Sequence, residues 1–85
     1  MILNKNTDNL MFLDELKKGD TAIIEEILDT NICIKLIEMG CLPGEIVLVR
    51  MTAPFRDPIA IEVSGNLISL RKSEARTIKV KQIDL

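Results

Sequence analysis

The sequence has 85 residues, of which 47% are hydrophobic and 28% charged, so it can form one small core but not two domains. The net charge is −2: residues 1–45 carry four basic and nine acidic side chains, and residues 46–85 carry seven and four. This balance argues against a nucleic-acid binder, and the lack of any long apolar run argues against membrane insertion.

The first nine residues are largely polar and are expected to form a flexible tail before a single domain covering residues 10–85. They lack the basic and then apolar pattern of a secretory signal, which predicts a cytoplasmic location. Cys33 and Cys41 are then expected to stay reduced, because disulfides are rare in a reducing compartment.

Next along the chain comes a short docking segment. Leu13 and Leu16, followed by a turn at Gly19, predict a single helical turn that packs its apolar side chains on the core. Residues 21–28 are rich in β-branched side chains and predict the first strand.

Residues 31–39 predict the main helix. Thr30 or Asn31 can cap its start, because either side chain can accept a hydrogen bond from an unpaired backbone N–H. Gly40 can adopt the left-handed conformation that closes a helix.

The second half of the chain predicts four more strands. Residues 45–51 are apolar on both faces, which is typical of a central strand covered on both sides. After a loop with two prolines, the next strand points Ile59, Ile61 and Val63 to one face.

A hairpin turn is predicted at residues 64–66, where Gly65 and Asn66 both tolerate positive φ. The returning strand buries Ile68 and Leu70, and one helical turn capped by Ser73 leads into a last strand over residues 77–83 that points Ile78 and Val80 inward. Five short strands in so small a chain predict a closed or nearly closed barrel, because closure removes exposed sheet edges. The fold class is therefore mainly β, with one capping helix and a short helical turn.

The main helix carries more apolar surface than a small barrel needs to cover. At about 100° per residue, Cys33, Leu36 and Ile37 centre an apolar arc roughly twice the usual width, so part of it should stay exposed for a partner. We interpret Leu36 and Ile37 as candidates for the core. The residues predicted to contact the partner are Ile32, Ile34, Met39 and Leu42. Alternatively, the apolar residues among the first eleven fold over this face.

Known catalytic and metal-binding patterns are missing from the sequence. It has no histidine, no Cys-x-x-Cys pair and no phosphate-binding loop, so we expect no catalytic residues, no cofactor and no metal site. The neighbouring pairs Asp14–Glu15 and Glu25–Glu26 are interpreted as surface acids, because adjacent residues on a strand point to opposite faces.

Four segments together resemble one known family. They are the opening LDELKKG at 13–19, KLIEMGCLPG at 35–44, APFRDPI at 53–59 and ISLRKSEARTI at 68–78. In this order and spacing they are similar to the signature of ferrous iron transport protein A, the FeoA family. The likeness spans residues 13–81.

The resemblance implies an SH3-like barrel and a role as a cytoplasmic accessory protein of ferrous iron uptake. Its implied partner is the cytosolic part of the ferrous iron permease FeoB, which includes a G domain, and its implied action is on assembly or activity. Three positions depart from the family pattern. Arg56 replaces a usual glycine and would be strained if φ is positive there, Lys35 replaces a common arginine, and Cys41 replaces a larger apolar residue.

Two other interpretations remain open. Small barrels also bind oligonucleotides, although Phe12 and Phe55 are the only aromatic residues here and no nucleic acid is expected as a partner. The chain could also be a stand-alone relative of the SH3-like domain of a metal-dependent repressor. We expect a monomer, with weak self-association left open.

Overall fold

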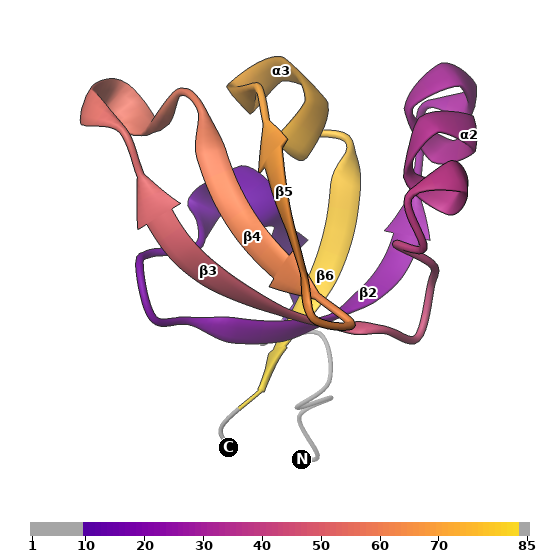
Figure 1. The fold of residues 1–85 in the computed structure, drawn as a ribbon, viewed down its shortest axis with the longest axis horizontal. Helices are drawn as coiled ribbons and strands as arrows, with labels where there is room; N and C mark the ends of the chain where they lie inside the picture. Colours follow the sequence, from indigo (N-terminus) through magenta and orange to yellow (C-terminus); the bar gives the residue numbers. More distant parts are fainter. Residues whose placement is uncertain (1–9, 84–85) are drawn as a thin grey trace, which may run out of the picture.

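The computed structural model describes residues 10–83, so the predicted tail lies outside the described residues. Six antiparallel strands form one sheet in the order β1-β6-β2-β3-β4-β5, and Figure 1 shows that this sheet is strongly curved. The strands are β1 (Leu10–Phe12), β2 (Thr21–Ile27), β3 (Ile46–Thr52), β4 (Ile59–Val63), β5 (Asn66–Leu70) and β6 (Ile78–Ile83). The helical segments are η1 (Leu13–Glu15), α2 (Thr30–Glu38), η2 (Pro54–Arg56) and α3 (Lys72–Ala75).

One hydrophobic core lies inside the curve of the sheet. Alternate residues of the strands point into it, as the period-2 pattern predicts. The inward positions expected on β4, β5 and β6 are all buried, and Leu13 and Leu16 dock from η1 and the residue after it, as expected. The mainly β fold class is therefore confirmed.

The number of strands differs from the expected five. The additional strand, β1, has only three residues and pairs with β6, where Met11 lies opposite Val80. A segment this short shows no periodicity, and its partner lies about seventy residues away, so local sequence could not reveal it. Within the described residues no pairing joins β5 to β1, so strand pairing does not close the curved sheet into a continuous barrel.

The expectation that β3 is covered on both faces is wrong. Val47 and Val49 are buried, but Ile46 and Met51 are exposed, because no second layer covers the outside of the sheet. The pairing of β3 with β4 also shifts register between Val49 and Met51, so Arg50 is an extra residue and Met51 turns away from the core.

Two turn assignments also need correction. In the β4–β5 hairpin the positive φ angles fall on Ser64 and Gly65, not on Asn66, which is the first residue of β5. The first turn of α3 is stabilised by the Glu74 carboxylate, which accepts a hydrogen bond from the backbone N–H of Arg71 at 2.9 Å; Ser73 is not the cap. Glutamate three residues after a helix start can satisfy this N–H.

The main helix starts one residue earlier than predicted and is capped by Asp29, not by Thr30 or Asn31. The Asp29 carboxylate accepts the backbone N–H of Ile32 at 3.0 Å. At the other end Gly40 has a φ of 84°, as predicted, and the N–H of Cys41 donates to the carbonyl of Leu36 at 2.8 Å. This Schellman arrangement brings two buried side chains, Leu36 and Cys41, into the core.

Candidate interaction surface

Helix α2 stands at one side of the sheet, as Figure 1 shows, and only part of its circumference is buried. Leu36 is fully buried, and Ile32 is half-buried and packs against the core from the preceding turn. A lysine fixes the helix to α3, since Lys35 Nζ lies 2.9 Å from Glu74 Oε2. The rest of the helix faces away from the barrel.

Three of the four predicted contact residues are exposed: Ile34 by 53%, Met39 by 39% and Leu42 by 39%. Ile32, the fourth, is partly buried and packs against the core. Of the two candidates for the core, Leu36 is buried, whereas 48% of Ile37 is exposed. Neighbouring positions on a helix differ by about 100°, so a helix that buries Leu36 fully can still turn Ile37 outward.

Two further apolar residues are exposed where the chain enters and leaves this region, Leu28 after β2 and Ile46 at the start of β3. Sequence reasoning missed both. The one available signal was that Ile46 is adjacent to the buried Val47 on a strand, so its side chain points to the opposite face of the sheet. We call the α2 surface the set Leu28, Ile34, Ile37, Met39, Leu42 and Ile46.

The loop over residues 53–58 forms a second exposed region at the far side of the sheet from α2 (Figure 1). Phe55 is 92% exposed, and Phe55 and Arg56 both have positive φ angles, of 64° and 60°. The guanidinium of Arg56 donates to the carbonyl of Asp14 at 3.2 Å. Since Phe12 is half-buried, Phe55 is the one exposed aromatic residue in this part of the chain, too few to stack successive bases.

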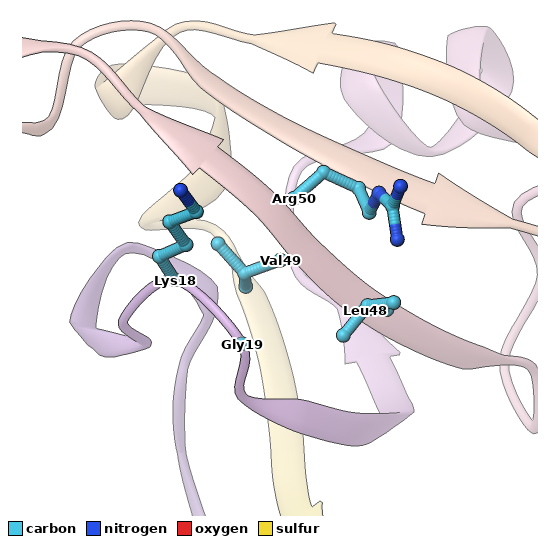
Figure 2. A pocket seen from close by; sticks show the side chains of 5 residues that line it. All are labelled: Lys18, Gly19, Leu48, Val49 and Arg50. Carbon is cyan, nitrogen blue, oxygen red and sulfur yellow. The ribbon is translucent and has the colours of Figure 1, made fainter.

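A small hollow of about 380 Å³ lies between the loop before β2 and β3. Figure 2 shows that Lys18 and Arg50, its two cationic residues, point apart, and Arg50 Nε lies 3.5 Å from Glu62 Oε1. No buried polar side chain occurs within residues 10–83, so the hollow offers no built site for a ligand.

Metal-ligating residues do not gather in the described part of the chain, which contains no group of three or more His, Cys, Asp or Glu. Glu25 and Glu26 are both exposed, as expected of surface acids, and the β2–β6 pairing shifts register between Ile24 and Glu26. Both cysteines are free, and burial raises the pKa of the Cys41 thiol to about 11. A neutral buried thiol packs as a small apolar side chain.

Comparison with known proteins identifies the family. A family model of the FeoA domain matches residues 11–82, which is most of the chain. The chain belongs to the FeoA domain family. The resemblance drawn from four sequence segments is thereby confirmed.

Among curated proteins, a Porphyromonas gingivalis fusion of Fe(2+) transport protein A with the Fe(2+) transporter FeoB is 35% identical over 74 residues. The match covers 86% of this chain but only 9% of the fusion protein, so the chain spans a small part of its length. The shared part is thus a single domain of that longer polypeptide.

Solved FeoA structures share the fold. The Chlorobium tepidum FeoA protein has a TM-score of 0.81 at 32% identity, covering 87% of this chain and 71% of that one. Stenotrophomonas maltophilia FeoA, crystallised with zinc and described as a prokaryotic SH3 domain protein, has a TM-score of 0.74 at 30% identity, covering 84% and 89%. The predicted SH3-like fold is thereby confirmed.

More distant structures also share the fold, among them a manganese-dependent transcriptional repressor with a TM-score of 0.78 at 18% identity, covering 87% of this chain and 42% of that one. The structure of T. acidophilum IdeR has a TM-score of 0.76 at 22% identity, covering 87% of this chain and 34% of that one. At this identity the likeness shows a common fold and nothing about function.

Proposed function

We propose that this FeoA-family chain is a small cytoplasmic accessory protein of ferrous iron uptake that binds the cytosolic part of a FeoB-type permease and modulates its assembly or activity. The observation that carries the proposal is the fusion of a related FeoA protein with FeoB in one polypeptide. Fusion holds two domains at millimolar effective concentration, which favours a contact that is weak between separate chains.

The α2 surface is the proposed contact. It presents exposed aliphatic and thioether side chains without any covering element in the described residues, and exposed apolar clusters of this kind mark protein interfaces. Ile34 and Ile37 lie one turn apart on the outer side of the helix, and Met39 and Leu42 follow at its end. Ile32 anchors the helix to the barrel under this contact.

The proposed role is binding, and the chain is proposed not to be an enzyme. It has no histidine, and the described residues hold no cluster suited to a metal ion. Iron is therefore treated as the cargo of the permease. No helix within residues 10–83 is long and apolar enough to cross a membrane, and the cytoplasmic location follows from the proposed partner.

Glutamate substitutions inside and outside the α2 surface test the proposed contact. Met39→Glu and Leu42→Glu should weaken binding to the purified cytosolic domain of the permease by about 1–2 kcal/mol, because each places a charge in an apolar interface. Met51→Glu is the control, since Met51 is also exposed but lies outside the α2 surface. Calorimetric titration with and without GTP measures binding, and the melting temperature shows whether each variant folds.

The expected pattern is normal melting for all three variants, with binding lost only for the changes at positions 39 and 42. Exposed substitutions usually alter stability by about 0.5 kcal/mol or less. Normal binding by Met39→Glu and Leu42→Glu would contradict the proposed surface. Unfolding of either would show that its side chain belongs to the core.

A further inference from the structure

Strand β5 is an open edge of the sheet. It stands at one end of the strand order and has extensive contacts with β4 alone in the described structure. The hairpin has a two-residue loop, so Asn66, Ile68 and Leu70 direct their backbone groups to β4. Leu67 and Ser69 therefore direct their N–H and C=O groups outward, and none of these groups bonds to another group in residues 10–83.

This edge lacks the protection that edge strands usually carry. Its sequence, Asn-Leu-Ile-Ser-Leu, contains no charge and no proline, and its pairing with β4 has no bulge. Leu67 is 68% exposed. The opposite edge strand, β1, has three residues in the described part of the chain. An unprotected strand of five residues is a template for pairing with another strand.

We propose that β5 pairs antiparallel with β5 of a second copy of this chain. A two-fold axis at Ile68 places Leu67 of one copy opposite Ser69 of the other, so the outward groups of both residues form four backbone hydrogen bonds. The edge of β5 is a different surface from the α2 surface, and its pairing does not depend on the permease.

Charge complementarity favours a second copy as the occupant. Arg71 and Lys72 follow β5, and Arg71 Nε lies 3.8 Å from Asp57 Oδ1 of the same chain. At the hairpin before β5, the hydroxyl of Ser64 donates to the carboxylate of Glu45, the residue before β3, at 2.8 Å. In the proposed register Lys72 of one copy faces Ser64 of the other, which brings the Lys72 ammonium toward the Glu45 carboxylate that Ser64 contacts. The two-fold axis repeats this contact.

Pairing two five-residue strands gives an interface below the standard size, so the dimer should form at concentrations on the order of 10 µM to 1 mM. Sedimentation velocity over this range measures it. Ser69→Pro removes the outward N–H while leaving the bonds to β4, because proline is tolerated on an edge where its nitrogen faces solvent. Ser69→Ala is the matched control, since it keeps the N–H.

We expect dimerisation of the natural chain and of Ser69→Ala, and about tenfold or greater weakening in Ser69→Pro and in Leu67→Lys, which adds the charge that protects edges. Amide exchange supplies a test without mutation: the Leu67 and Ser69 amides should become protected as concentration rises, while the Ile68 amide is protected throughout. A chain that stays monomeric, or protection of these amides only by the permease domain, would overturn the proposal.

Discussion

At the scale of single residues, Phe55 and Arg56 adopt backbone conformations that residues with a side chain rarely adopt. Both have positive φ angles, which cost roughly 1 kcal/mol for a residue with a Cβ, so Arg56 meets the condition under which strain is expected. The Arg56 side chain offsets part of this cost through its bond to the Asp14 carbonyl, which glycine could not make. Phe55 has no such compensation, because its ring is exposed.

Phe55→Gly is therefore expected to raise the free energy of unfolding by about 0.5–1 kcal/mol, because glycine adopts this conformation without a steric cost. Phe55→Ala is the control: it removes the same ring but keeps the strained backbone, so its stability should stay close to that of the natural chain. Urea unfolding measures both. Equal stabilities for the glycine and alanine variants would show that the loop stores no strain.

At the scale of elements, the position of α2 depends on one ion pair to α3 as well as on burial of Leu36. The hydrogen bond from Lys35, with a second from the backbone N–H of Arg71, holds the pKa of the Glu74 carboxyl below its ordinary value. A carboxyl whose pKa is lowered by folding stabilises the folded state above its unfolded pKa and loses that contribution as pH falls through the folded pKa.

Lys35→Met is expected to lower the free energy of unfolding by about 0.3–1 kcal/mol near neutral pH, the usual range for an exposed pair. The difference from the natural chain should shrink as pH falls through the lowered pKa of Glu74, because the carboxyl becomes protonated in both. Lys18→Met, at an exposed lysine in the loop before β2, is the control. Denaturant unfolding across this pH range measures the effect, and a difference that does not depend on pH would refute the role of Glu74.

At the scale of the whole molecule, one curved sheet surrounds one core, and the polar groups stay outside it. Calorimetric titration with Zn²⁺ or Fe²⁺ is therefore expected to show only weak binding to surface carboxylates, because the chain lacks histidine and the described residues hold no suitable cluster. A site filled by one metal per chain would contradict this expectation. One metal per two chains would instead indicate ligands shared between copies.

The amino-acid sequence determined those elements that are set by a few neighbouring residues. The alternation of β4 and β6 predicted their buried faces, and Gly40 marked the helix end, because side-chain parity and backbone freedom are properties of a few neighbouring residues. The resemblance to the FeoA family is recognised from the order and spacing of four segments, and both can be read from the sequence alone.

The tertiary structure decided which apolar residues are covered. Leu36 and Ile37 are adjacent and chemically similar, yet only Leu36 is buried, because the angle at which α2 meets the sheet selects the buried side. Met51 faces solvent because a register shift with β4 reverses its parity, and β1 exists only because β6 pairs with it. Each outcome depends on contacts between segments far apart in the chain, and periodicity within one segment carries no information about where its neighbours lie.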